Sequence, residues 1–349
     1  MVRQSGRVEG YSKLKYFARV ASGVRYSKFK AMLDCCHEKS GRSRVAMSFD
    51  ILLSAALFGA GYYDYAIFGF YDIDYRHRAT YITRAKNARL INMLNDETFA
   101  RTFDMKSVQA RRLLPYFKRG VLFVAEANEE SLRDFMADKE VVFAKPEDGV
   151  SGRGIERLRI SDFDSVADML NYIKQPEKKF GLLEQAIVQH PDLSRLYPLA
   201  INTQRVVTLM DSAGEVHVVY ATQKLGDKGK FVDNLENDGM CVPINPVDGK
   251  LVGLAHTSRL EVLERHPYSG IVFDGYQLPY VQQTFELVKA AAKAVPEMRF
   301  LGWDIAITPD GPVVVEANDW PGYDFWQLPE QTPNRIGLVP VYKKLVPGF

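Results

Sequence analysis

Three oxygen-bearing side chains near the end of the sequence have the types and spacing of a metal site. Asp304 lies inside an apolar run, and Glu316 and Asn318 end the next one. Alternation along a strand places Glu316 and Asn318 on one face, and a hairpin turning at residues 310–311 brings Asp304 opposite them. Carboxylate and amide oxygens suit Mg²⁺, and burying two carboxylates without a cation is costly. The alternative is a buried acid satisfied by backbone N–H groups.

A lysine and a glycine-rich loop form a second candidate site. Lys145 ends an apolar run, and the loop after it contains Gly149, Ser151, Gly152 and Gly154. Closely spaced glycines present backbone N–H groups to phosphate oxygens. Ser151 adds a hydroxyl donor, and Lys145 adds a point charge for the same oxygens. A flexible connection between strands is the alternative interpretation. The metal candidates Asp304, Glu316 and Asn318 further along the sequence favour phosphate binding.

The elements that must position these residues change in type near residue 120. The first third of the chain has helical patterns, and short apolar runs of strand type follow, separated by helices. Turns at residues 211–214 and 309–311 predict two antiparallel hairpins, and residues 280–295 predict an amphipathic helix. This order is not a Rossmann alternation, and the sequence contains neither GxGxxG nor a Walker loop. We therefore predict an α+β fold.

The composition conceals an uneven distribution of charge. The 349 residues are 46% hydrophobic and 25% charged, which is ordinary for a globular protein. A net charge of +2 argues against nucleic-acid binding through bulk charge. Residues 1–48 nevertheless carry 11 Lys/Arg and 3 Asp/Glu, a net charge of +8, whereas the remainder carries −6. The basic block suits a membrane surface, a nucleic acid or an acidic partner, or it is a solvated N-terminus.

Cysteine usage and hydropathy give expectations for location. Cys35, Cys36 and Cys241 form neither a disulfide framework nor a metal-type spacing, which predicts a reducing cytoplasm. Residues 1–20 lack the apolar core of a secretory signal. The most apolar run, residues 51–63, is shorter than the ~20 residues of a spanning helix. We expect a cytoplasmic protein without a transmembrane segment or a nucleic-acid partner. Its oligomeric state is not indicated.

Taken together, these residues resemble the ATP-grasp superfamily. The resemblance covers residues 95–330 and rests on four motifs in order: residues 143–146, the glycine loop, residues 183–187, and Asp304 with Glu316-x-Asn318-x-x-Pro-Gly. Residues 202–205, 232–234, 302–306 and the aromatic segment 62–82 resemble the sugar-transfer associated branch, which is related to alpha-L-glutamate ligases. The resemblance implies an ATP-grasp fold, in which two α+β lobes clasp ATP, preceded by a mostly helical N-terminal region.

The resemblance also implies roles for individual residues. Lys145 would contact the α/β-phosphates, and the loop with Gly149, Ser151, Gly152 and Gly154 would close over the β/γ-phosphates. Glu184 would accept from the adenine amino group, the backbone of Gln185 and Ile187 would complete the hinge, and Asp192 would contact the ribose. Asp304, Glu316 and Asn318 would hold two Mg²⁺ ions, with Mn²⁺ as an alternative. The resemblance places Arg205 and Lys224, as catalytic residues, at the transferring phosphate.

Three positions depart from the family pattern. Related ligases have a nucleotide-binding lysine where this sequence has Glu97, and nothing in the sequence shows that Lys106 replaces it. D-alanine–D-alanine ligase and its relatives have an arginine where this sequence has Gly302. Stabilisation of the intermediate must then come from elsewhere, with Arg205 the first choice. Lys224 stands where the branch leads us to expect arginine.

The predicted domains are an N-terminal accessory region (1–95), an ATP-grasp region (96–330) with lobes at about 116–190 and 195–330, and a C-terminal tail (331–349). The resemblance implies an ATP-dependent, ADP-releasing ligase that joins a small-molecule carboxylate to an amine through an acyl phosphate. The substrate would be a sugar, an amino acid or a polysaccharide-linked compound. The alternatives are a kinase or other phosphotransferase using the same site, and a non-catalytic ATP-binding protein.

Overall fold

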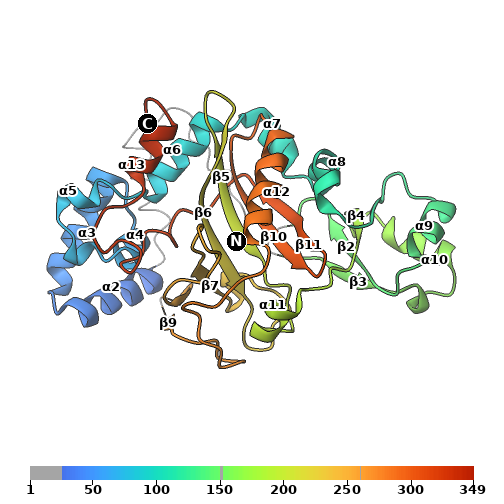
Figure 1. Cartoon of the computed structure of the whole chain (residues 1–349), viewed down its shortest axis with the longest axis horizontal. Helices are drawn as coiled ribbons and strands as arrows, with labels where there is room; N and C mark the ends of the chain where they lie inside the picture. Colours follow the sequence, from blue (N-terminus) through green and yellow to red (C-terminus); the bar gives the residue numbers. More distant parts are fainter. Residues whose placement is uncertain (1–25, 150–151, 260) are drawn as a thin grey trace. The chain divides into compact units, whose positions relative to one another are not determined.

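The computed structural model of the chain describes residues 26–149, 152–259 and 261–349 (Figure 1). The described residues form two compact units. Residues 95–321 make up the large unit, and residues up to 94 combine with residues 322–349 in the small unit. Ser151, which the sequence assigns to the phosphate loop, lies outside the described residues.

An antiparallel sheet of seven strands, counted over the described residues, organises the large unit. The strand order is β11 (Gly311–Asn318), β10 (Phe300–Thr308), β5 (Gln204–Met210), β6 (Val216–Leu225), β7 (Met240–Pro243), β8 (Ala255–Thr257) and β9 (Val262–Leu263). The turns at residues 211–214 and 309–311 join β5 to β6 and β10 to β11. Both predicted hairpins are therefore confirmed. They place Asp304, Glu316 and Asn318 on β10 and β11, at one edge of this sheet.

A smaller antiparallel sheet carries the lysine and the glycine loop. Its order is β1 (Val121–Phe123), β4 (Phe180–Gln185), β2 (Val142–Pro146) and β3 (Glu156–Leu158). Helices α9 (Glu129–Met136) and α10 (Val166–Ile173) contribute Leu132, Met136, Met169 and Ile173 to an apolar cluster that includes Val142 of β2. This cluster holds β2 in the sheet, and Lys145 follows near its end.

Helices cover the large sheet because their apolar residues recur at the helical period. Helix α12 (Val281–Lys293) buries Val281, Phe285 and Val288 and contacts β5, β6, β10 and β11. Figure 1 shows it beside the last two of these strands. Helices α7 (Glu97–Phe103), α8 (Lys106–Phe117) and α11 (Pro191–Leu196) complete the unit. The α+β fold class and the helix predicted over 280–295 are confirmed.

The small unit is helical. It contains α2 (Tyr26–Ser40), α3 (Arg44–Phe58), α4 (Tyr62–Ile67), α5 (Tyr75–Arg78), α6 (Arg84–Leu94) and α13 (Val339–Leu345). The side-chain amide of Gln327 bonds to both backbone groups of Ile82, which attaches the C-terminal segment to the helices. No helix among the described residues is long and apolar enough to span a membrane.

A carboxylate lies in the interior of the small unit. Asp64 is 1% exposed and accepts hydrogen bonds from the backbone N–H groups of Gly61 and Arg84 and from the Tyr323 hydroxyl, which is 2.6 Å away. Burial raises the pKa of Asp64 to about 6, and these hydrogen bonds only partly oppose it. The folded state therefore binds this proton more tightly than the unfolded chain does.

We predict that this group makes the small unit less stable as the pH rises. A pKa raised in the folded state means that the stabilisation is complete below about pH 4 and is lost as the pH rises through about 6. The loss amounts to about 2–3 kcal/mol. Chemical denaturation at a series of pH values would show a smaller decline for Asp64→Asn than for the wild type. Parallel curves for the two proteins between pH 4 and pH 7 would contradict the prediction.

Candidate active site

The acidic residues come together through the register of three neighbouring strands. Asp304 on β10 pairs with Glu316 on β11 and, on its other side, with Arg205 on β5. Gly302 pairs with Asn318. Directly opposed residues share a face of an antiparallel sheet, so the two carboxylates and the arginine project from the same face.

An irregularity in β11 is required for this arrangement. From the turn to the pair Ile305–Val314, the strands keep one register, and the register then shifts so that Asp304 opposes Glu316. Without the shift, Val315 would oppose Asp304. A bulge of one residue changes which side chains share a face. The bulge therefore puts the second carboxylate on the face of the first.

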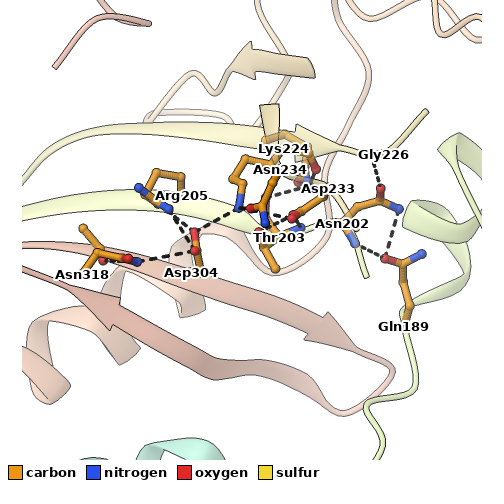
Figure 2. A network of polar contacts seen from close by, with 12 residues as sticks. Gln189, Asn202, Thr203, Arg205, Lys224, Gly226, Asp233, Asn234, Asp304 and Asn318 are labelled. Carbon is orange, nitrogen blue, oxygen red and sulfur yellow. Dashed lines mark hydrogen bonds and ion pairs between the residues drawn. The ribbon is translucent and has the colours of Figure 1, made fainter. Parts of the chain in front are cut away.

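Asp304 is held by two cations. Arg205 contacts both carboxylate oxygens, with Nε–Oδ1 and Nη2–Oδ2 distances of 2.7 and 2.9 Å, and the Lys224 Nζ lies 3.6 Å from Oδ1 (Figure 2). The Asp304 side chain is only 6% exposed. Burial opposes its ionisation, but the charges of Arg205 and Lys224 outweigh this effect and hold its pKa well below the usual range. Asp304 is thus a carboxylate at any physiological pH.

Glu316 has a cation of its own, which the sequence did not identify. The Nζ of Lys106, the first residue of α8, lies 2.7 Å from the Glu316 carboxylate. Burial raises the pKa of Glu316, and the Lys106 charge more than reverses this, so the pKa is lowered. By contrast, Glu97 is an exposed residue of α7 that pairs with Arg101. Lys106 therefore brings to the site the positive charge that is missing at Glu97.

The third carboxylate lies in the smaller sheet. Glu184 on β4 contacts Lys145 of β2 at 2.8 Å and Arg119 at 2.7 Å. Burial opposes ionisation of Glu184, but both cations hold its pKa below the usual value. Burial lowers the pKa of Lys145, and Glu184 opposes this only in part. Lys145 thus has one close carboxylate partner, Glu184, whose place a phosphate oxygen could take.

The phosphate-loop and metal candidates converge on a single cavity. It has a volume of about 130 Å³ and is lined by six of the predicted residues: Lys145, Gly149, Gly152, Lys224, Asp304 and Glu316. Lys106 and Arg153 add two further cations to its wall. Gly154, with a φ of +72°, lies against Pro146 beside the loop. The cavity thus has the charge pattern of a site for phosphate and a metal ion.

The other predicted residues lie outside the lining of this cavity. Gln185 donates its backbone N–H to the Gly120 carbonyl, and its side-chain oxygen accepts from the Gly120 N–H. Ile187 follows β4 and is half-buried, and Asp192 lies in the first turn of α11, with its backbone N–H donating to His190. Asn318 directs its amide nitrogen at Asp304, at 3.5 Å. The adenine and ribose candidates thus follow one another along the chain from β4 to α11.

A polar network extends the site beyond the residues first singled out. Asp233 accepts from the backbone and the hydroxyl of Thr203 and lies 3.2 Å from Lys224, which also donates to Asn234 (Figure 2). Thr203, Asp233 and Asn234 line the cavity. The sequence singles out loop 232–234 through the family resemblance and as a candidate substrate contact, but nothing local in the sequence indicates its contacts with Thr203 and Lys224.

The glycine at position 302 has a steric explanation. A Cβ built on Gly302 would lie 3.5 Å from the Arg205 Cδ and 3.2 Å from the Pro321 backbone. Pro321 therefore leaves little room for a side chain at position 302, and the Arg205 side chain lies beside it at ordinary contact distance. The Arg205 guanidinium thus reaches Asp304 from the neighbouring strand β5.

The donor set fits a hard divalent cation. Two carboxylates oppose each other on paired strands, and an amide stands two residues away, which is the oxygen chemistry that Mg²⁺ prefers. In the described part of the chain, no group of three or more His, Cys, Asp or Glu side chains is arranged to hold a metal. An ion here would therefore depend on Asp304, Glu316, the Asn318 oxygen, and oxygens from a ligand or water.

The two-sheet fold and a cavity lined by lysines, glycines and paired carboxylates define an ATP-grasp protein. The chain belongs to the sugar-transfer associated ATP-grasp family, whose family model matches residues 76–344. The resemblance predicted from the sequence is confirmed. A search of curated proteins gives no match.

Solved structures with related folds are distant. The ATP-grasp ligase PsnB with its minimal precursor is 17% identical, over 78% of this chain and 70% of that chain, with a TM-score of 0.42. The purK N5-carboxyaminoimidazole ribonucleotide synthetase is 14% identical, over 72% and 52%, with a TM-score of 0.40. The Thermotoga maritima synthetase of the same name is 12% identical, over 66% and 48%, with a TM-score of 0.38. This chain spans about half the length of the two synthetases.

We predict that the ion pairs of Asp304 stabilise the ligand-free protein. Asp304→Asn leaves Arg205 and Lys224 without their carboxylate, and breaking a buried pair in this way costs about 3–5 kcal/mol. Denaturant unfolding of the large unit measures the loss. Asp310→Asn, in the exposed turn of the same hairpin, is the matched control and should change stability by less than about 0.5 kcal/mol. Equal stability of the two variants would argue against the pairing.

Proposed function

We propose that the chain is an ATP-dependent carboxylate–amine ligase that works through an acyl phosphate. The observation that carries the proposal is the charge pattern of the cavity. Three lysines (Lys106, Lys145 and Lys224) and two opposed carboxylates line it. Phosphoryl transfer needs positioning and charge neutralisation more than a covalent nucleophile. The one hydroxyl among the described lining residues, on Thr203, donates to Asp233.

In this proposal, the lysines of the two sheets bind the phosphates of ATP. Lys145 and Lys106 exchange their carboxylate partners for phosphate oxygens, and the loop that contains Gly149 and Gly152 supplies backbone N–H groups. Gln185 would contribute its carbonyl oxygen to adenine, because its N–H is already bonded to Gly120. Ile187 and Asp192 continue the nucleotide site along the chain.

The carboxylate face holds the reacting phosphoryl group. Asp304, Glu316 and Asn318 would hold Mg²⁺, which neutralises the charge that develops on the transferring phosphoryl group. Arg205 and Lys224 lie on the same side of Asp304 and would contact that group and the carboxylate that attacks it. Arg205 keeps its charge under all conditions. The amine then displaces phosphate from the acyl phosphate, releasing the amide.

The cysteines support a proposal about the cellular compartment. None of the three cysteines forms a disulfide, and Cys36 and Cys241 are buried. Burial raises the pKa of the Cys36 thiol to about 12, which keeps it protonated and unreactive. We therefore propose that the protein works in the cytoplasm.

The proposal predicts which substrates release ADP. We expect ADP and phosphate together with an amide, identified by mass analysis, when the enzyme is screened with amino acids and amino sugars as carboxylate and amine donors. A stable phosphoester with ADP would instead indicate a phosphotransferase. ATP binding without turnover across a broad panel would indicate a non-catalytic protein.

Glu316 is predicted to be essential for turnover. Glu316→Gln keeps the size of the side chain but removes the charge that would hold the metal, and we expect kcat to fall by about 10³-fold or more. Glu215→Gln, in the exposed β5–β6 turn, is the matched control. A Glu316→Gln enzyme that keeps its melting temperature and turns over normally would show that the metal assignment is wrong.

Lys106 is predicted to contribute to nucleotide affinity. Lys106→Ala should weaken ATP binding by about 10–100-fold, because a charge-assisted contact to phosphate is lost, whereas Lys293→Ala at the exposed end of α12 should not. Titration calorimetry with ATP measures both. Since Glu316 also loses its partner, a melting curve of the variant shows whether the site remains folded. Unchanged ATP affinity in a folded variant would exclude this role.

A further inference from the structure

Helix α3 has apolar residues on two faces. Its inward face consists of Met47, Ile51, Ser54 and Ala55, which are buried in the small unit. Its outward face consists of Val45, Ala46, Phe49, Leu52, Leu53, Ala56 and Leu57, which are all exposed. Phe49 is 69% exposed, Leu52 63% and Leu57 59%. One apolar face explains the packing of a surface helix, and the second face remains to be explained.

The outward face is continuous. At about 100° per residue, its seven members fall within an arc of roughly 140° along the whole 15-residue helix. The one charged residue between Val45 and Phe58, Asp50, is turned away from this face, because both of its carboxylate oxygens bind Arg78. Scattered apolar residues on a surface are ordinary, but a contiguous patch of this kind marks an interaction site.

Cations stand at the start of this helix. Lys39, Arg42 and Arg44 lie within the six residues before Val45 and are exposed. Asp34 neutralises Arg44 at 2.7 Å, which leaves Lys39 and Arg42 as exposed cations beside one exposed acid, Glu38. Lys28 and Lys30 are exposed on α2, which contacts α3. Residues 1–48, which include these cations, have a net charge of +8.

An apolar helical face next to exposed Lys and Arg matches the chemistry of an anionic lipid surface. Such a helix lies in the plane of the interface, with its apolar side in the acyl boundary and its cations at the phosphates. We propose that α3 docks this protein peripherally on an anionic membrane through Val45, Phe49, Leu52, Leu53 and Leu57, with Lys39 and Arg42 at the lipid headgroups.

A second copy of the chain fits the same face less well. The helix is about 22 Å long and about 10 Å wide, so the face covers roughly 200–300 Å² in projection. A stable specific interface needs about 800 Å² on each partner. If the two helices paired in parallel, their positively charged starts would also repel each other. Binding to a lipid surface increases with the apolar area buried and is reinforced by the opposite charge of anionic headgroups.

The full-length protein can be tested by co-sedimentation with vesicles. We expect it to bind vesicles that contain phosphatidylglycerol, to bind phosphatidylcholine vesicles at least about 5-fold more weakly, and to lose binding as salt is added. Phe49→Ser with Leu53→Ser should reduce the partition coefficient at least about 10-fold. Lys39→Gln with Arg42→Gln should reduce it about 5-fold or more on anionic vesicles only.

The control is a pair of exposed apolar residues in the large unit. Val247→Ser with Tyr268→Ser removes side chains that are 84% and 58% exposed and should leave the partition unchanged. Melting curves and ATP binding check that each variant remains folded. The proposal is overturned if Phe49→Ser/Leu53→Ser binds vesicles like the wild type, if the wild type does not bind anionic vesicles, or if sedimentation velocity shows a dimer that this variant abolishes while vesicle binding is absent.

Discussion

Four carboxylates around the cavity of the large unit are each paired with a cation, and this pairing offsets the cost of taking them out of water. Removing a charge from water costs several kcal/mol, and only a close partner offsets that cost. The ion pairs involve four carboxylates, Asp233, Asp304, Glu316 and Glu184, and five cations, Arg205, Lys224, Lys106, Lys145 and Arg119. A ligand that carries phosphates and a divalent cation can exchange into this set without leaving a charge unpaired. Under the proposed function, the same pairing stabilises the site and favours a ligand with this pattern of charges.

Packed strands fix the positions of the charged side chains Arg205, Asp304 and Glu316 more precisely than a loop would. Arg205, Asp304 and Glu316 stand on three adjacent strands, and their neighbours Trp303 and Ile305 are fully buried in the core. The Trp303 indole donates to Thr208 at 2.8 Å, which fixes β10 against β5. Because side chains alternate along β10, burial of Trp303 on one face directs Asp304 to the other. The packing of the core therefore determines the direction of the Asp304 carboxylate.

The sequence predicts those parts of the site that depend on local periodicity. The expectation that Asp304 faces Glu316 is confirmed, but the Asp310–Gly311 turn with a simple hairpin register would have opposed Val315 to Asp304, and only the bulge brings Glu316 to that position. The bulge depends on how β11 packs, so it leaves no clear signal in the sequence. Lys106 and its partner are 210 residues apart, and no local pattern connects residues at such a separation. The attachment of residues 322–349 to the helical unit is equally non-local, since Gln327 bonds to Ile82 across 245 residues.

Under the proposed function, in which Lys145 binds a phosphate, Arg119 would let Glu184 remain charged. Its guanidinium contacts the Glu184 carboxylate on β4 and also donates to the Val314 carbonyl on β11. It therefore joins the small sheet to the strand that carries Glu316. If Lys145 turns to a phosphate, Glu184 still has Arg119 as a partner, and the cost of a lone buried carboxylate is avoided. Two cations on one carboxylate are more than stability alone requires. The excess makes sense if one of them, Lys145, is the one that leaves.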